Sequence, residues 1–278
     1  MTALLLSLGS AVTFGAADFL GGLATRRGDA VPVAAVSQAV GLVLVATAML
    51  FLPGSLSTPA MIWGGVAGLA GAGGLVAYFR ALGMGQMGAA APMASLVGAA
   101  VPVTFGLGLG ERPDQLAVVG IAVGIAGTVL VSRSGGSLTP ETAAQRRGLL
   151  VAAFAGALFG VFFVALDQAP DDSGLWPLVA ARIVGLVLLG AVIAARRPAW
   201  PRGRVAGMAS TSGLLDMTAN VLFLLATREG LLVLTSVVTG LYPVGVVLLA
   251  WLVLRERLGR SQQAGVALAL GATVLIAV

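Results

Sequence analysis

The sequence predicts an all-α integral membrane protein with ten transmembrane helices, arranged as two inverted five-helix repeats. Three observations support this prediction: the composition, the spacing of the apolar stretches, and a second half that repeats the first. Hydrophobic residues make up 58% of the 278 residues and charged residues only 10%, with a mean hydropathy of +1.02. A soluble domain carries about 25% charged residues. Lipid must therefore be the solvent for most of the surface.

Ten apolar stretches have the length of a membrane span. A hydrocarbon core about 30 Å thick requires roughly 20 residues of helix. The predicted spans lie near residues 3–24, 32–52, 61–83, 89–109, 116–132, 148–166, 175–195, 205–226, 231–254 and 264–278. The longest connection is polar, rich in glycine and serine, and close to the midpoint, which is typical of a linker. We therefore expect a first repeat over 1–132, a linker over 133–147, and a second repeat over 148–278.

The two halves share an ordered set of residues. SQAVGLVLV at 37–45 recurs as ARIVGLVLL at 181–189. Further matched pairs are Phe14-Gly15 with Phe159-Gly160, Phe79 with Phe223, Pro102 with Pro243, Glu111-Arg112 with Glu256-Arg257, Gly120 with Gly265, and Thr128 with Thr273. Apolar segments resemble one another by chance, but prolines and charged residues recurring in order at a nearly constant offset indicate duplication. Five spans is an odd number, so the second copy enters the membrane from the opposite side, as in many secondary transporters.

Several classes of function are excluded by residues that the chain lacks. It contains no cysteine and no histidine, and all 16 basic residues are arginine. Disulfides, thiolate metal sites and the usual proton shuttle are thereby excluded, and we expect no metal and no cofactor. The net charge of +5 comes from arginines scattered through short turns, so no nucleic-acid partner is expected. The abundance of arginine, alanine, glycine and valine is typical of a high-GC bacterial genome, which predicts a multi-pass protein of the bacterial plasma (inner) membrane.

Two segments resemble a known family. The stretch from Tyr242 to Ala277 has a proline in mid-span, then a Glu-Arg turn, a glutamine and a glycine-rich last helix. Residues 90–131 carry a shorter copy of the same pattern. Both resemble the signature of the EamA-type branch of the drug/metabolite transporter (DMT) superfamily, and the resemblance extends over the whole chain. It implies a transporter, usually an exporter, and says little about the substrate.

The arginines also predict an orientation. Turns after even-numbered spans hold only Arg112 and Arg228, whereas turns after odd-numbered spans hold twelve arginines: Arg26, Arg27, Arg133, Arg146, Arg147, Arg196, Arg197, Arg202, Arg204, Arg255, Arg257 and Arg260. Cytoplasmic turns carry the excess of basic residues, which places both termini outside. Members of the resembling family are usually drawn with both termini in the cytoplasm, so the two indications conflict.

Polar side chains within the spans are the candidate site residues, because a charge at mid-membrane costs about 2.5–3.5 kcal/mol. Asp216 and Asn220 lie four residues apart on one face of span 8 and are candidates for binding substrate, with a structural ion pair as the alternative. Arg182 in span 7 could bind an anionic group or pair with Asp216 or Asp18. Gln38 occupies the corresponding position in the first half.

The remaining candidates lie nearer to span ends or beside prolines. Asp18 could line a cavity or reach the membrane interface, and Asp216 and Asp18 are the proton-coupling candidates. Arg80 is expected to extend to the interface. Tyr242 is a candidate substrate contact because it precedes Pro243, and both Pro102 and Pro243 are candidate flex points, with a static kink as the alternative.

These observations predict a secondary transporter working by alternating access, with a small-molecule substrate and membrane lipid as its partners, as a monomer or weak homodimer. The acidic and basic residues within the spans are compatible with three classes of substrate: a zwitterion such as an amino acid, a cation, or an anion. Export and proton coupling are expected. The alternatives are a non-transporting membrane sensor or assembly protein and a lipid-modifying membrane enzyme. The enzyme would need a nucleophile, metal cluster or paired carboxylates; Asp171-Asp172, the one adjacent acidic pair, is in a turn.

Overall fold

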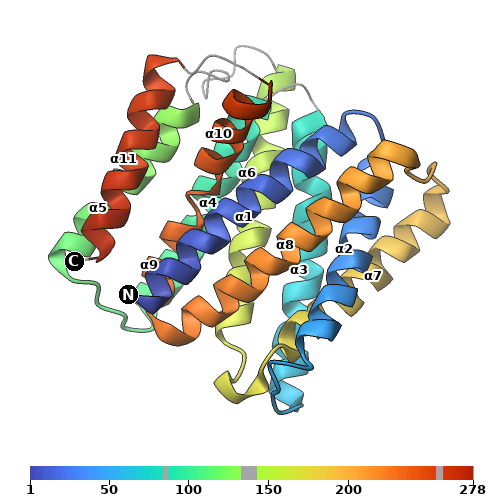
Figure 1. The fold of residues 1–278 in the computed structure, drawn as a ribbon, viewed down its shortest axis with the longest axis horizontal. Coiled ribbons are helices and arrows are strands. Elements are labelled where there is room, and N and C mark those ends of the chain that lie inside the picture. Colours follow the sequence, from blue (N-terminus) through green and yellow to red (C-terminus); the bar gives the residue numbers. More distant parts are fainter. Residues whose placement is uncertain (84–86, 133–142, 255–258, 278) are drawn as a thin grey trace.

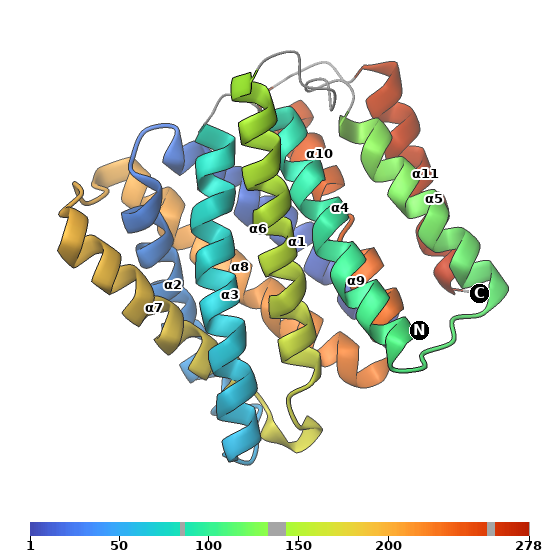
Figure 2. The same ribbon diagram turned by 180° about the vertical axis from the view of Figure 1, so that it is seen from behind.

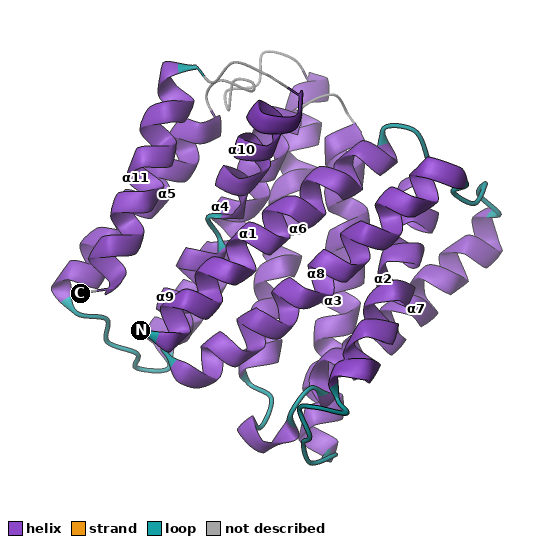
Figure 3. Ribbon diagram, viewed as in Figure 1, coloured by secondary structure: helices purple, strands orange, loops and turns teal. Residues whose placement is uncertain are grey.

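A computed structural model describes residues 1–83, 87–132, 143–254 and 259–277, and every regular element within them is helical (Figure 3). The elements are α1 Thr2–Thr25, α2 Ala30–Ala48, α3 Thr58–Gly83, α4 Met87–Gly108, α5 Gln115–Ser132, α6 Ala143–Asp167, the 3₁₀ turn η1 Asp171–Ser173, α7 Trp176–Arg196, α8 Gly203–Glu229, α9 Leu232–Thr239, α10 Tyr242–Leu254 and α11 Arg260–Ala277. Each predicted span corresponds to one of these helices, except that span 9 comprises both α9 and α10.

The helices have the length and composition of a multi-pass membrane protein. Seven stretches among the described residues are long and apolar enough to cross a bilayer, and α9 and α10 together form one of them. Within α4 and α5 the apolar segments are shorter, Met93–Gly108 and Gln115–Leu130. The coarse fold prediction, an all-α membrane protein, is therefore confirmed.

The predicted linker is shorter at its C-terminal end than expected. Residues 143–147 form the first turn of α6, because alanine, glutamine and arginine are good helix formers and no proline or glycine interrupts them. The rest of the linker, residues 133–142, and the Glu256-Arg257 motif lie outside the described residues.

Span 9 is broken between α9 and α10, at Gly240 and Leu241. Pro243 has no backbone N–H, so it cannot continue the hydrogen-bond ladder of a helix that would run through it. The N–H of Val244 donates to Leu241 O at 2.9 Å, and the carbonyl of Gly240 is left for a partner outside the helix. The break thus precedes the proline, whereas Pro102 lies within the continuous helix α4.

The helices pack in a set of pairs (Figures 1 and 2). The helix α1 lies along α8, and α6 lies against both α3 and α4. On one side of the molecule α2 and α7 contact each other, and on the opposite side α5 pairs with α11. The beginning of α1 and the end of α11 lie at the same end of the molecule (Figure 1).

Small residues allow the helices to approach closely. A Cβ atom on Gly64 would lie 2.5 Å from Pro177 O, and one on Gly68 would lie 2.5 Å from Ala181 O. These two glycines let α3 lie directly on α7. Lipid chains are as apolar as leucine, so membrane helices associate through such backbone contacts rather than through a hydrophobic driving force.

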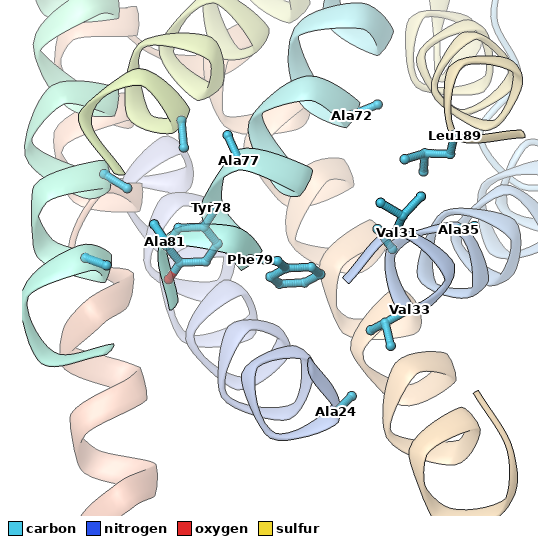
Figure 4. Close-up of a cluster of buried hydrophobic side chains, with 14 of the residues drawn as sticks. Ala24, Val31, Val33, Ala35, Ala72, Ala77, Tyr78, Phe79, Ala81 and Leu189 are labelled. Atoms are coloured by element: carbon cyan, nitrogen blue, oxygen red, sulfur yellow. The ribbon is translucent and has the colours of Figure 1, made fainter. Parts of the chain in front are cut away.

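One apolar cluster is centred on α2 and α3 and includes residues of α1, α4, α6, α7 and α8 (Figure 4). Tyr78 and Phe79 lie in it together with Val33 and Leu189, and most of the remaining members are alanines. The cluster fixes the C-terminal part of α3 and so the position of the Tyr78 hydroxyl group.

At the end of the molecule that carries the termini, Glu111 joins the two halves. Its carboxylate oxygens accept hydrogen bonds from the backbone N–H groups of Leu232 and Val233, at 3.0 and 2.8 Å. These are free donors at the N-terminus of α9, where a negative charge is stabilising. The loop after α4 therefore caps a helix of the second half.

Candidate functional site

A cavity lies between the two halves of the chain, with about 860 Å³ of space between its lining atoms, including the part that opens to the outside. Apolar and aromatic side chains form most of the lining, among them Phe14, Phe159, Phe162 and Phe163. The polar residues that line it are Asp18, Gln38, Ser95, Arg182, Asp216, Asn220, Ser236 and Tyr242. A mostly apolar cavity with a few convergent polar groups is the usual form of a small-molecule site.

Arg182 links three helices at this cavity. Its Nη1 donates to Gln38 Oε1 at 2.6 Å, and its Nη2 forms a salt bridge with Asp216 Oδ2 at 2.5 Å. The arginine is buried, whereas the Asp216 side chain keeps 23% of its surface exposed to the cavity. The positive charge of Arg182 is therefore balanced inside the protein, from α8, and not left free for an anion.

Asn220 lies one turn after Asp216 on α8 and supports the same carboxylate. Its Nδ2 donates to Asp216 O at 2.7 Å and to Asp216 Oδ2 at 3.2 Å. Because these acceptors fix the orientation of the amide, Asn220 Oδ1 is left as an acceptor, and it is buried without a hydrogen-bond partner among the described residues.

Asp18 has a different environment from Asp216. Its Oδ2 accepts a hydrogen bond from the Tyr78 hydroxyl at 3.2 Å, and no described arginine pairs with it. Phe14 lies one turn earlier on the same face of α1, and its ring is 6.4 Å from that of Tyr242. Asp18 is thus a carboxyl group with a neutral hydroxyl partner beside aromatic rings.

Ser95 satisfies the carbonyl that the break in span 9 leaves free. Its hydroxyl donates to Gly240 O at 2.5 Å, so α4 of the first half holds the turn between α9 and α10. Non-helical backbone at membrane depth is tolerated where such partners exist. The nearby Ser236 hydroxyl donates within its own helix, to Val233 O at 3.1 Å.

The structure brings most of the predicted site residues together. Six of them line the cavity: Gln38, Arg182, Asp216, Asn220, Tyr242 and Asp18. Arg80 is exposed near the end of α3 and is not a lining residue. Pro102 is buried in α4 and does not line the cavity, and Pro243 follows Tyr242 directly after the break.

Other lining residues were missed by reasoning from the sequence. The sequence criterion was a charged or amide side chain within a span. Phe14 and Phe159 are not polar, and the serines Ser95 and Ser236 are too common in membrane helices to meet it. A signal was present, because Phe14 and Phe159 belong to the repeated Phe-Gly pair. Tyr78 is packed in the apolar cluster, and its hydroxyl also donates to Asp18.

The fold and the cavity define a multi-pass membrane protein with a mostly apolar cavity between two halves. The model of the EamA-like transporter family matches residues 1–133 and again residues 146–278. The chain therefore belongs to the EamA-like transporter family and is a transporter of the DMT type rather than a member of an enzyme family.

A comparison with solved structures supports the fold, and a comparison with curated proteins finds no match. A protein of known crystal structure, 22% identical in sequence, superposes with a TM-score of 0.76 over 98% of this chain and 95% of its own. That similarity concerns the fold alone. No curated protein matches the sequence.

Proposed function

We propose that the protein is a secondary transporter that moves a small organic solute through the central cavity by alternating access between two inverted halves. The observation that carries the proposal is that matched positions of the two repeats line one cavity. These pairs are Phe14 with Phe159, Gln38 with Arg182, and Ser95 with Ser236. A site on the axis that relates two repeats is lined in this way.

The helix contacts support the same symmetry. The contact of α1 with α8 corresponds to that of α6 with α3, and the contact of α3 with α7 corresponds to that of α8 with α2. The helices α2 and α7 contact each other, as do α5 and α11, and in each case the two helices hold equivalent places in their repeats. Two halves with five crossings each would then be related by an axis in the membrane plane.

Alternating access is tested by single-cysteine labelling, for which the natural chain is suited because it has no cysteine. Ala99→Cys places a thiol at the cavity, and we expect a membrane-impermeant maleimide to label it from either side of the membrane during transport. Val187→Cys, at a position 69% exposed on the outside of α7, is the control that lipid should protect. Labelling of Ala99→Cys from one side only, under all conditions, would contradict the proposal.

The orientation that we propose follows the arginines, with the turns after odd-numbered spans in the cytoplasm and export as the direction. The exposed residues Ser55 and Arg202 lie in turns at opposite ends of the molecule. In intact cells of a bacterial host, Ser55→Cys should react with an impermeant maleimide and Arg202→Cys should not. The reverse pattern would overturn the orientation and favour the usual drawing of the family.

For proton coupling we propose Asp18 in preference to Asp216. A proton on Asp216 would break the salt bridge to Arg182, whereas a proton on Asp18 disturbs only a bond to a neutral hydroxyl. In proteoliposomes, Asp18→Asn should abolish the dependence of flux on an imposed pH gradient. Asp29→Asn, at the exposed N-cap of α2, should leave that dependence intact, and an unchanged Asp18→Asn variant would remove Asp18 from the coupling.

A further inference from the structure

The cavity contains one more carboxyl group than it has cationic side chains to pair with them. Three formally charged side chains line it: Asp18, Asp216 and Arg182. Arg182 is paired with Asp216 through a salt bridge of 2.5 Å. Asp18 is left without a cation among the described residues, and its second carboxylate oxygen has no hydrogen-bond partner there.

The cavity also contains acceptor atoms with lone pairs that the described residues leave unused. The hydroxyl protons of Ser95 and Ser236 are used by backbone carbonyls, which leaves their oxygen lone pairs. Asn220 Oδ1 is a buried acceptor with no partner in the described part of the chain, and Asn220 is only 2% exposed. A buried acceptor without a donor costs about 1–3 kcal/mol, and a donor on a ligand would remove this cost.

Aromatic rings surround the face of α1 that carries Asp18. Phe14, one turn earlier, lies 6.1 Å from the ring of Phe163 and 6.4 Å from that of Tyr242, measured between ring centroids. The faces of such rings attract cations, and their bodies supply apolar contact area.

From these observations we propose that the transported solute is an organic amine, bound through its ammonium group at Asp18, with an aromatic or other apolar body in the phenylalanine-lined part of the cavity. This inference rests on the proposed transport function and specifies its substrate class. The ammonium group supplies both a positive charge for Asp18 and N–H donors for these unused acceptors. Arg182, already paired, serves to hold α2, α7 and α8 together rather than to bind a carboxylate.

The test uses three probes of similar size and different charge: 2-phenylethylamine, 2-phenylethanol and phenylacetate. Binding to the purified full-length protein is measured by isothermal titration calorimetry. We expect 2-phenylethylamine to bind about tenfold or more tightly than 2-phenylethanol, since a charged donor on a carboxylate forms a stronger bond than a neutral one. Phenylacetate should bind most weakly, because Asp18 repels it.

The variants locate the ammonium group. Asp18→Asn should remove the preference for the amine over the alcohol, Asp18→Glu should retain it, and the control Asp29→Asn should leave it unchanged. If Asp18→Asn does not fold, the ranking of the three probes on the natural protein decides the question alone.

Three outcomes would overturn the inference: equal affinity for the amine and the alcohol, tighter binding of phenylacetate, or no binding of 2-phenylethylamine. Tighter binding of phenylacetate would assign the site to an anion at Arg182. None of these results would remove the transport function, because the labelling of Ala99→Cys from both sides is independent of the charge of the solute.

Discussion

Residues that pack the two halves together occur in matched pairs, whereas the charged residues between the halves do not. Gly68 of the first half lies against Ala181 of the second, and Gly213 of the second half lies against Ser37 of the first. A Cβ atom added to Gly41 would lie 3.4 Å from Arg182 Nε, and one added to Gly185 would lie 3.4 Å from Gln38 Nε2. The two interfaces are therefore built alike, down to the polar residue that each glycine faces.

The lining of the cavity differs between the halves in chemistry. At the offset that relates Phe14 to Phe159, Asp18 corresponds to Phe163. At the offset that relates Gly68 to Gly213, Asp216 corresponds to Gly71. Matched packing is what the proposed exchange of conformations between the halves requires, and the unmatched charge is the basis of the proposed preference for an amine.

The largest expected effect on stability comes from substitutions at Gln38 and Arg182. These two residues hold matched positions in the two halves but differ in charge. Arg182→Gln should lower the free energy of unfolding by about 3 kcal/mol, because it leaves Asp216 without its cation. Gln38→Leu removes only the neutral partner of the arginine and should cost about 1 kcal/mol. Unfolding by sodium dodecyl sulfate in mixed micelles measures both.

A double variant separates loss of the charge pair from loss of packing. Arg182→Gln combined with Asp216→Asn should recover most of the stability, since no uncompensated charge remains. Equal losses for Arg182→Gln and Gln38→Leu would show that the charge difference between the halves has no energetic consequence.

The second prediction concerns the matched glycines. Gly68→Ala and Gly213→Ala should each lower the free energy of unfolding by about 2 kcal/mol, because the new methyl group meets backbone atoms of the facing helix. Gly65→Ala is the matched control on α3, as an added Cβ there has no atom within 4 Å. Clearly unequal losses at Gly68 and Gly213 would contradict the equivalence of the two interfaces.

A smaller effect is expected at the loop between α4 and α5. Glu111→Ala removes two hydrogen bonds to the N-terminus of α9 and should cost about 1.5 kcal/mol in mixed-micelle unfolding. The neighbouring exposed Arg112 provides the control, and Arg112→Ala should have little effect. A loss of similar size in both variants would mean that the cap adds nothing to the loop.

The smallest expected change in the free energy of unfolding is found by comparing the two serines of the cavity, Ser95 and Ser236. Ser95→Ala removes the partner of the Gly240 carbonyl at the break in span 9, at a cost of about 1 kcal/mol. Ser236→Ala removes only a bond within its own helix and should change stability by a few tenths of a kcal/mol. The same unfolding measurement applies, and a larger loss for Ser236→Ala would contradict the role given to Ser95.

Reasoning from the sequence located the spans well and their interruptions less well. Pro243 indicated an irregularity in span 9, but the break lies at Gly240 and Leu241, because a proline disturbs the hydrogen bonds of the preceding turn. Pro102 carries the same signal and lies in a continuous helix. A proline limits where helix bonds can form, and the partners that other helices offer decide whether the helix ends.

The sequence by itself determined the solvent, the helices and the repeat. A bilayer imposes composition and length on each span, and a duplication leaves residues in register, so both are written along the chain. The partners of the buried polar groups were decided only by the tertiary structure. Arg182 had Asp216 and Asp18 as candidate partners. The packing of both α7 and α8 against α2 gave it Asp216 and Gln38 and left Asp18 to Tyr78. Charge pairing depends on distances across helices, and those distances follow from how small residues let the helices approach.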